Sequence, residues 1–491
     1  MKIAQLLTQV PFYKITKAIE HINVKGLSMD SRSVQPGDLF VCIRGHEVDG
    51  HVFAKDAVSK GAVVLVAEEE LDTEVPVIIV NDTTKVLAML AAAFYEAPTE
   101  SMQLIGVTGT NGKTSITYLL DEIFRAHKVT TGVIGTIQMR IAGASYPAKN
   151  TTPDSLSLQQ TFARMKEAGV QTAIMEVSSH ALNQGRVYGC DFDIAIFTNL
   201  SQDHLDYHDN MDDYLRAKSL LFAQLGNSYH MERSKMAVIN LDSPVAGKLI
   251  RSTAQPVLTY GIKGSADVKA ENIHLHEKGV SFSLKTPAET IEINSPLMGL
   301  FSVYNMLASA SAALASGVPL TTIRHSFEHS EGIRGRFEPV LEGQNFGVVI
   351  DYAHTPDSLE NVLSTVKEFC RGDIHVVVGC GGDRDRTKRP LMADVAMKYG
   401  TDVIFTSDNP RSEDPNEILR DMTNHLEGGY KVIEDRREAI RSALASAEKG
   451  DVVLIAGKGH ETYQEIDGIR HDFDDREVAR ELLKQVKESQ S

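Results

Sequence analysis

Short apolar runs alternate with amphipathic stretches along most of this chain, and the period of each pattern predicts the element that it forms. In the first part, GDLFVCIRG from Gly37 and GAVVLVAEE from Gly61 predict buried strands, and VLAMLAAAF from Val86 predicts a helix. A linker is expected after that helix, because Pro98 disfavours helical geometry at the residue before it. We therefore predict a first domain over residues 1–97.

A second segment repeats the order of strand, polar loop and helix. It opens with QLIGVTGTNGKTSITYLLDEIF, and further apolar runs follow in TAIMEVSSH, DIAIFTNLSQDH and MAVINLD. Strands that alternate with helices predict a parallel, doubly wound sheet. Residues 256–296 change to short alternating runs, which predict a small antiparallel insertion, and the helix after them is expected to end at Gly317. This central domain is predicted over residues 98–331.

A third segment, predicted over residues 332–491, repeats a buried strand followed by a polar cluster four times. The four runs are GVVIDYAHTP, HVVVGCGGDRD, DVIFTSDNPR and VVLIAGKGHE, and an amphipathic helix is expected after Asp474. In an open α/β sheet, ligands bind beyond the carboxyl ends of the strands. The four clusters should therefore face one crevice of a Rossmann-like domain. The whole chain is predicted to be an α/β protein of three domains.

Composition and charge narrow the class of protein. The 491 residues carry a formal net charge of -16, and such an acidic chain lacks the large basic surface that nucleic acids require. The four cysteines form no C-x-x-C pair, and the chain shows neither a signal-peptide core nor an apolar run of membrane-spanning length. We expect a cytoplasmic protein with no membrane insertion and no nucleic-acid partner.

The strongest chemical signal is the loop GTNGKT between a predicted strand and a predicted helix. Its glycines allow backbone N–H groups to surround phosphate oxygens, and the helix N-terminus adds a favourable dipole. Lys113 would reach the β- and γ-phosphates of a nucleotide, and the Thr114 hydroxyl would bind Mg²⁺. The loop departs from the G-x-x-x-x-G-K-[ST] pattern, because residue 107 is Val. The alternative is a glycine-rich turn that only connects strand to helix.

Other side chains of this segment are candidates for the same site. Glu176 ends a predicted strand, where a carboxylate beside a phosphate loop is well placed for Mg²⁺, and the alternative is a solvated Glu beside a capping serine pair. His204 and His208 are four residues apart, but this spacing alone favours solvated or core histidines over a metal site. Lys218 lies in an apolar helical stretch, where composition alone favours a lysine that snorkels from a half-buried face.

Charged side chains gather in the clusters of the third segment. Arg384 and Arg411 suit a planar, two-contact grip on carboxylates. With Asp351, His354 and the loop GKGHE they would fit a ligand that carries both carboxylates and an ammonium group, such as an amino acid with a second charged end. Ion pairs at loop tips would explain any one of the clusters but explain four of them poorly.

The order of these motifs resembles that of the Mur ligase family. GTNGKT, MEVSSH, FTNLSQDHLDYH, YLRAKSLLF, GLFSVYN, GIRGRFE, DYAHTP, GCGGDRD, DNPR and AGKGHE follow the family's order, and DSRSVQPGDLFVCIRGHEVDGH matches near the N-terminus. The resemblance covers essentially the whole chain. It implies a ligase that uses ATP and Mg²⁺, with three domains that bind the UDP end of the substrate, ATP and the incoming amino acid.

The combination of DNPR with AGKGHE resembles the branch of the family that adds diaminopimelate. The implied substrates are UDP-N-acetylmuramoyl-L-alanyl-D-glutamate and meso-2,6-diaminopimelate, and a monomer is expected. ATP would phosphorylate the glutamate side-chain carboxylate, and an amine of diaminopimelate would then attack the acyl phosphate. Arg411 would distinguish the substrates, because it would pair with the distal carboxylate that lysine lacks.

The resemblance also assigns roles residue by residue. The ATP site would comprise Gly109, Thr110, Asn111, Gly112, Lys113, Thr114, Asn305, Arg336, Asp351 and His354. The UDP-linked substrate would be held by Met29, Ser31, His46, Glu47, Val48, Asn150, Thr151, Thr152, Ser178, Gln184 and Arg186. Diaminopimelate would be bound by Arg384, Asp408, Asn409, Pro410, Arg411, Gly457 and Glu461. The catalytic residues would be Lys113, Glu176, His204 and Lys218, with Lys218 carbamylated and Mg²⁺ served by Thr114, Glu176, His204 and Lys218.

Three other functions remain open from the sequence. A folylpolyglutamate synthase shares the GTNGKT loop, but it would need neither the DNPR cluster nor the UDP-binding first segment. A lysine-adding relative would have another sequence at DNPR. A nucleotide-dependent switch protein would use the loop for regulation and would leave the four clusters of the third segment without a purpose.

Overall fold

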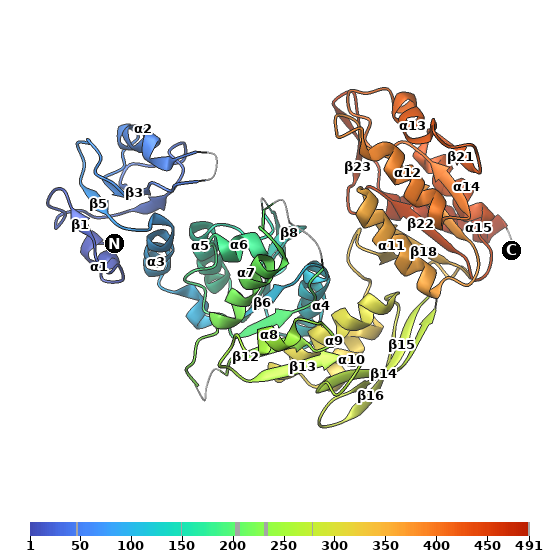
Figure 1. Cartoon of the computed structure of the whole chain (residues 1–491), viewed down its shortest axis with the longest axis horizontal. Helices are drawn as coiled ribbons and strands as arrows, with labels where there is room; N and C mark the ends of the chain where they lie inside the picture. The colour runs from blue at the N-terminus through green and yellow to red at the C-terminus, as the bar shows by residue number, and fades with distance from the viewer. Residues whose placement is uncertain (46–47, 149, 202–206, 230–233, 277, 490–491) are drawn as a thin grey trace. The chain divides into compact units, whose positions relative to one another are not determined.

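The computed structural model describes residues 1–45, 48–148, 150–201, 207–229, 234–276 and 278–489 (Figure 1). The chain forms two compact units, which comprise Met1–Ala266 with Ala308–Val318, and Asp267–Leu307 with Pro319–Ser491. The boundaries of the three domains inferred from the sequence stay a prediction. Within the described part of the chain, every helix is too short or too polar to cross a membrane.

The first sheet is built from the predicted apolar runs. Its strand order is β1 (Lys14–Ile15), β5 (Val77–Ile79), β4 (Val64–Ala67), β3 (Asp38–Val41) and β2 (Gly26–Ser28). β2 to β5 run parallel, and β1 pairs with β5 in the antiparallel sense. The helical elements are α1 (Ile3–Leu7), η1 (Gly50–Phe53), α2 (Ala54–Ser59), α3 (Thr83–Phe94) and η2 (Pro98–Ser101).

The helix predicted at Val86 begins slightly earlier than its apolar run. The Asp82 side chain caps α3 by accepting a hydrogen bond from the Lys85 N–H, which satisfies one of the free donors of the first turn. After the helix, Glu96 and Ala97 both adopt left-handed backbone angles. The helix therefore stops where the linker was predicted.

The second sheet carries the phosphate loop. The strands that belong to the first unit are, in order, β13 (Val257–Gly261), β12 (Met236–Asn240), β11 (Ile194–Phe197), β6 (Gln103–Thr108), β10 (Thr172–Glu176), β7 (Thr131–Ile134), β8 (Gln138–Ile141) and β9 (Ala144–Pro147). The strands from β13 to β7 are parallel, as the alternation of strands and helices predicted. The helices are α4 (Lys113–Ala126), α5 (Ser155–Glu167), α6 (Ser179–Asn183), α7 (Met211–Ala223) and α8 (Ala246–Ile250).

The prediction of an antiparallel insertion over residues 256–296 was wrong for its first part. β13 pairs in parallel with β12 and therefore belongs to the main sheet. Its first three residues are only half-buried, so the strand lacks the continuous apolar run of a central parallel strand. The antiparallel strands β8 and β9 were not predicted at all.

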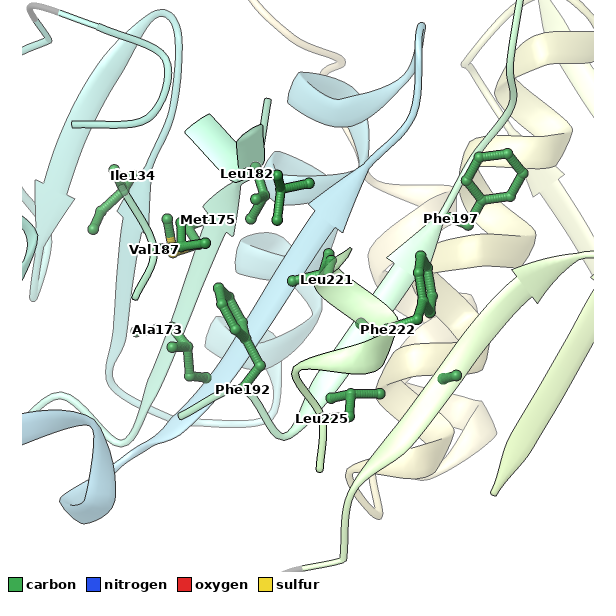
Figure 2. Close-up of a cluster of buried hydrophobic side chains, with 14 of the residues drawn as sticks. Ile134, Ala173, Met175, Leu182, Val187, Phe192, Phe197, Leu221, Phe222 and Leu225 are labelled. Atoms are coloured by element: carbon green, nitrogen blue, oxygen red, sulfur yellow. The ribbon is translucent and has the colours of Figure 1, made fainter. Parts of the chain in front are cut away.

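The packing around β6 explains the glycine in LIGV. Figure 2 shows the core on one face of the sheet, where Phe192, Leu221 and Phe222 are completely buried. The rings of Phe197 and Phe222 meet edge to face with centroids 6.5 Å apart. A Cβ at Gly106 would come within 2.6 Å of the Phe192 ring. Glycine is therefore required for the strand that leads into the phosphate loop to pack against this core.

The second unit begins with an antiparallel meander. It consists of β14 (Val268–His276), β15 (Gly279–Lys285) and β16 (Thr290–Ser295), as the alternating runs predicted. The predicted helix after the meander is α9 (Leu300–Ala315), followed at Gly317 by a residue with φ of 80° and then by α10 (Leu320–Glu328). Glycine adopts such angles without steric strain, so it stops the helix.

The third sheet confirms the four predicted strand-and-cluster repeats. Its order is β17 (Glu338–Pro339), β18 (Gly347–Asp351), β22 (Val452–Ala456), β19 (Ile374–Val378), β20 (Asp402–Phe405) and β21 (Tyr430–Val432). β18, β22, β19 and β20 are consecutive and parallel, so the four polar clusters leave the same edge of the sheet. A separate hairpin, β23 (Tyr463–Ile466) and β24 (Ile469–Asp472), was not predicted.

Helices cover both faces of this third sheet. The helices are α11 (Pro356–Phe369), α12 (Lys388–Tyr399), α13 (Pro415–Thr423), α14 (Arg436–Ser446) and α15 (Asp475–Ser489). α11, α12 and α13 share a core with Val376 and Val378, whereas α14 and α15 pack with Val377 on the opposite face. Successive residues of a strand point to opposite faces, so β19 is buried on both sides.

A buried ion pair ties the starts of α14 and α15 together. The Arg436 guanidinium donates two hydrogen bonds to the Asp475 carboxylate, at 2.8 and 2.7 Å, and a third to Ala456 O at 3.0 Å. Both charged side chains have no exposed surface. Because Ala456 ends β22, this pair fixes both helices against the strand that leads into the GKGHE loop.

Asp475→Ala should lower the free energy of unfolding by about 3–5 kcal/mol, because it leaves the Arg436 charge buried without its partner. Urea unfolding followed by far-UV circular dichroism measures this loss. Asp472→Ala, an exposed position nearby, is the matched control and should change stability by less than about 0.5 kcal/mol. Equal effects of the two substitutions would contradict the role given to the pair.

Candidate functional site

The phosphate loop is held by the segment that follows β11. Gly109 and Gly112 have φ angles of 147° and 88°, which favour glycine. The Asn111 N–H donates to Asn199 Oδ1 at 2.9 Å. A Cβ at Gly109 would lie 1.8 Å from Thr198 Oγ1. The loop is thus fitted closely to the segment after β11, which a simple connecting turn would not require.

Glu176 is a buried carboxylate at the end of β10. Its side chain is 1% exposed, so the solvated alternative was wrong. Thr114 Oγ1 donates to Glu176 Oε2 at 2.9 Å, and the Thr136 N–H donates to Oε1 at 2.8 Å. The Thr136 hydroxyl adds a bond to Oε2 at 3.1 Å. The carboxylate therefore joins the first turn of α4 to the loop after β7.

Two lysines converge on the same carbonyl of the phosphate loop. Lys113 Nζ donates to Gly109 O at 2.9 Å and to Thr110 O at 2.8 Å. Lys218 Nζ, from α7, donates to Gly109 O at 2.8 Å and lies 4.2 Å from the centroid of the Tyr214 ring. Lys218 is only 1% exposed, so the alternative of a lysine that snorkels from a half-buried face was wrong. The two ammonium groups therefore meet at one carbonyl of this loop.

Of the two histidines that are four residues apart, His208 lies among the described residues. His208 is buried, and its ring nitrogens lie 3.0 Å from Ser179 Oγ and 3.0 Å from Asp213 Oδ2. These partners match the core-histidine alternative. His204 lies outside the described residues.

The oxygen donors near the loop fit Mg²⁺ better than a softer metal. Within the described ranges, no group of three His, Cys, Asp or Glu side chains is placed to hold a metal. The Thr114 hydroxyl and the Glu176 carboxylate instead lie side by side. Mg²⁺ prefers oxygen ligands and is commonly held by one or two carboxylates together with substrate phosphates and water. This donor set fits that pattern.

Most residues assigned to the muramoyl dipeptide adjoin Glu176. Thr152 Oγ1 donates to Glu176 O at 2.8 Å and accepts the Ser178 N–H at 3.1 Å. Arg186 donates to Thr152 O at 3.0 Å and to Gln184 Oε1 at 2.9 Å. Thr151 lies 3.1 Å from the Thr136 hydroxyl, and Asn150 is exposed beside it. The structure therefore brings this set together next to the phosphate loop.

The residues assigned to the UDP end lie around the first sheet. Met29 is half-buried and Ser31 is buried just after β2, where Ser31 O accepts a hydrogen bond from Lys60 Nζ at 3.1 Å. Val48 is 51% exposed. His46 and Glu47 lie outside the described residues.

The remaining ATP residues lie in the second unit, whereas the phosphate loop lies in the first. Three of them lie around Tyr352, namely Arg336, Asp351 and His354. The Arg336 guanidinium carbon lies 5.3 Å from the centroid of the Tyr352 ring, and His354 Nδ1 lies 2.8 Å from Tyr352 O. Asn305 is buried on α9, away from these strand-end residues in the sequence. His354 is exposed, so it is available to a ligand.

Asp351 has a perturbed acidity. Burial at the end of β18 raises its pKa from 3.8 to about 6, although the Phe337 N–H and the Arg336 charge act in the opposite direction. The Phe337 N–H donates to Asp351 Oδ2 at 2.7 Å. A shifted carboxyl group in a strand-end cluster is typical of functional sites.

The residues assigned to diaminopimelate form a connected network at the edge of the third sheet. Asn409 Nδ2 donates to Glu461 Oε2 at 2.8 Å, which joins the loop after β20 to the loop after β22. Asp408, Asn409 and Pro410 are buried, so the alternative of ion pairs at loop tips was wrong for this cluster. A Cβ at Gly457 would lie 2.6 Å from Asp408 Oδ2, which explains the glycine.

The two candidate carboxylate-binding arginines reach one loop. Arg411 has a left-handed backbone with φ of 53°, its N–H donates to Glu465 O at 3.0 Å, and its Nη1 donates to Gly382 O at 2.6 Å. Arg384 is exposed and donates to Asp383 O at 3.2 Å. Strained backbone at a ligand-binding position is typical of functional sites.

Sequence reasoning missed two residues that shape these networks. Thr136, with two hydrogen bonds to Glu176, follows the strand β7, and a hydroxyl at a parallel strand end was the available signal. Lys458 lies within the GKGHE loop, but its side chain is completely buried, and nothing in the sequence pattern indicated this.

Three family models match successive parts of the chain. They are described as Mur ligase family, catalytic domain, over residues 23–95; Mur ligase middle domain, over residues 107–313; and Mur ligase, glutamate ligase domain, over residues 335–459.

Curated relatives match over their full length. A protein of Oceanobacillus iheyensis named UDP-N-acetylmuramoyl-L-alanyl-D-glutamate--2,6-diaminopimelate ligase is 56% identical over 490 residues, which cover 99% of each chain. A protein of the same name from Listeria innocua is 52% identical over 98% of each chain.

Solved structures share the fold over most of this chain. A structure of an enzyme of that name is 34% identical with a TM-score of 0.76, and the match covers 99% of this chain and 100% of the other. A MurF ligase of Thermotoga maritima in complex with ADP has a TM-score of 0.60 at 18% identity, over 95% and 99% of the two chains. A folylpolyglutamate synthase of Mycobacterium tuberculosis has a TM-score of 0.57 at 19% identity, over 76% and 92%.

The raised pKa of Asp351 makes a stability prediction. The carboxyl group of the native protein binds its proton more tightly than that of the unfolded chain. Its contribution to the free energy of unfolding is therefore complete below about pH 4 and is lost as the pH rises through about 6. Asp351→Asn keeps an acceptor for Phe337 and should remove this loss. The free energy of unfolding of the variant, measured relative to that of the wild type, should rise by up to about 3 kcal/mol between pH 4 and 7. Urea unfolding across this pH range measures the difference. A difference between variant and wild type that does not change with pH would contradict the raised pKa of Asp351.

Proposed function

Because this chain belongs to the Mur ligase family, we propose that it uses ATP to join meso-2,6-diaminopimelate to UDP-N-acetylmuramoyl-L-alanyl-D-glutamate, an amide-forming step of peptidoglycan synthesis. The observation that carries this proposal is the 56% identity, over 99% of both chains, to a relative whose name states this ligase activity. The enzyme acts in the cytoplasm, a compartment that suits its four free cysteines.

The phosphate loop is the ATP site. The N–H groups and glycines of residues 109–114 surround the phosphates, and Lys113 turns from the loop carbonyls to the β- and γ-phosphates. Buried Glu176 and the Thr114 hydroxyl would hold Mg²⁺, together with His204 and Lys218. When bound, Mg²⁺ supplies positive charge that offsets the charge of the phosphate oxygens.

Lys218 acts as a carbamate. Its neutral amine adds CO₂ to form the N-carboxylate and releases one proton. The carbamate nitrogen keeps one N–H, so the hydrogen bond to Gly109 O is compatible with the modification. The product replaces a cation by an anion beside the candidate Mg²⁺ ligands, which accounts for a buried lysine at this position.

The second unit supplies the amino-acid site and further ATP contacts. Arg411 pairs with the distal carboxylate of diaminopimelate, and Arg384, Asp408, Asn409, Pro410, Gly457 and Glu461 complete the site, with the Glu461 carboxylate available to an ammonium group of the ligand. Further contacts to the substrates come from Asn305, Arg336, Asp351 and His354 for ATP, and from Met29, Ser31, His46, Glu47, Val48, Asn150, Thr151, Thr152, Ser178, Gln184 and Arg186 for the UDP-linked dipeptide.

The reaction proceeds in two transfers. The glutamate side-chain carboxylate attacks the γ-phosphorus, the bond to ADP breaks, and an acyl phosphate forms; Lys113 stabilises the transferring group. The diaminopimelate amine, as its free base, then attacks the acyl carbon. The bond from that carbon to the phosphate oxygen breaks, phosphate leaves, and the amide nitrogen loses a proton. No covalent enzyme intermediate is required.

The alternatives receive less support. The solved folylpolyglutamate synthase matches a smaller share of this chain, 76%, than the diaminopimelate ligase structure, 99%. A lysine-adding enzyme would not need Arg411 beside the loop at Gly382, because lysine has no distal carboxylate. A switch protein would not need the connected network of strand-end clusters in the second unit.

Lys218→Ala should lower the rate of phosphate release about 10- to 100-fold, the usual effect of losing a residue that supports a metal site. The wild type should also lose activity in CO₂-free buffer and recover it with bicarbonate, whereas the variant should not respond. Lys248→Ala, an exposed lysine paired with Asp212, is the matched control. Full activity of Lys218→Ala, or a wild type indifferent to CO₂, would rule out the carbamate.

Arg411→Lys tests the choice of amino acid. Lysine keeps the charge but loses the two-pronged contact, so KM for diaminopimelate should rise about 10- to 100-fold while KM for ATP stays within about twofold. Steady-state phosphate release measures both constants. Arg420→Lys, on the exposed face of α13, is the control. An equal rise of the KM values for diaminopimelate and for ATP would contradict the role assigned to Arg411.

A further inference from the structure

A completely buried lysine lies beneath the candidate amino-acid site. Lys458 follows β22 in the GKGHE loop, and its side chain has no exposed surface. Its Nζ donates to Asn409 Oδ1 at 2.9 Å and lies 3.3 Å from Glu461 Oε2. The Tyr463 ring centroid is 5.6 Å away. An ammonium group withdrawn from water is unfavourable unless such partners compensate.

These contacts fix the orientation of the Asn409 amide. Asn409 Oδ1 accepts hydrogen bonds from Lys458 Nζ and from the Glu465 N–H, at 2.9 and 3.0 Å. The NH₂ end therefore points to Glu461 Oε2, at 2.8 Å. Turning the amide over would place two donors against Lys458 and Glu465 and would lose all three bonds.

The same lysine also fixes Glu461. Among the ion pairs between described residues, Lys458 is the cation paired with this carboxylate. Oε2 is occupied by Lys458 and Asn409, so Oε1 is the oxygen left to receive a ligand ammonium group. Glu461 is 18% exposed, which allows such a ligand to reach it.

We propose that Lys458 is a positioning residue that sets the affinity for the incoming amino acid by holding Asn409 and Glu461 in their binding arrangement. It does not touch the amino acid itself. The inference rests on the proposed function, because it concerns the site that binds diaminopimelate. A purely structural ion pair would instead support folding without any preference for one substrate.

The test uses the full chain and the variant Lys458→Met, which keeps the length of the side chain and removes its charge. KM for diaminopimelate should rise about 30-fold, corresponding to about 2 kcal/mol for a broken buried charge pair, and KM for ATP should stay within about twofold. Lys449→Met, an exposed lysine before the start of β22, is the matched control and should behave as the wild type.

A double variant shows whether Lys458 acts through Glu461. Glu461→Gln alone should also raise KM for diaminopimelate, and Lys458→Met/Glu461→Gln should lie within about threefold of the worse single variant, because coupled residues are not additive. If Lys458→Met does not fold, Lys458→Gln carries the same expectations, since glutamine keeps a donor but no charge.

Three outcomes would overturn the inference. An unchanged KM for diaminopimelate, an equal rise in both KM values, or multiplied effects in the double variant would each contradict it while leaving the ligase activity in place. A wild type without diaminopimelate-dependent phosphate release would contradict the proposed function itself, and this inference with it.

Discussion

Polar groups at the ends of buried parallel strands must find partners inside the protein, because helices on both faces of the sheet exclude water. Glu176 meets this requirement at the end of β10 with donors from Thr114 and Thr136. Asn409 meets it after β20 with Lys458 and Glu461. In both sheets, satisfying a buried polar group also aligns the loops that would bind the substrates.

The same requirement couples stability to chemistry. A buried carboxylate or ammonium group that is fully paired makes its surroundings rigid, and a binding site gains affinity when its groups are already in place. The buried Arg436–Asp475 pair belongs to the starts of α14 and α15, and the bond from Arg436 to Ala456 O anchors the end of β22 directly. Asp351 represents the opposite case, since its burial raises the pKa to about 6 and leaves a carboxyl group that is less favourable when ionised.

Much of this arrangement was predictable from the sequence because it depends on local patterns. Continuous apolar runs predicted the buried parallel strands, and the rule that ligands bind beyond their carboxyl ends predicted that four polar clusters share one edge. What could not be predicted depends on partners distant in the chain. The burial of Lys218 against Gly109 O and of Lys458 against Asn409 follows from packing, and β13 was misplaced because its half-buried residues resemble an antiparallel strand.

The most direct test of the central claim is phosphate release by the full-length enzyme with ATP, Mg²⁺ and UDP-N-acetylmuramoyl-L-alanyl-D-glutamate, with meso-2,6-diaminopimelate compared with L-lysine. The account predicts release that depends on diaminopimelate, with little release when lysine replaces it. Release with lysine alone would contradict the assignment of Arg411 to a distal carboxylate. The absence of release with either amino acid would contradict the ligase activity itself.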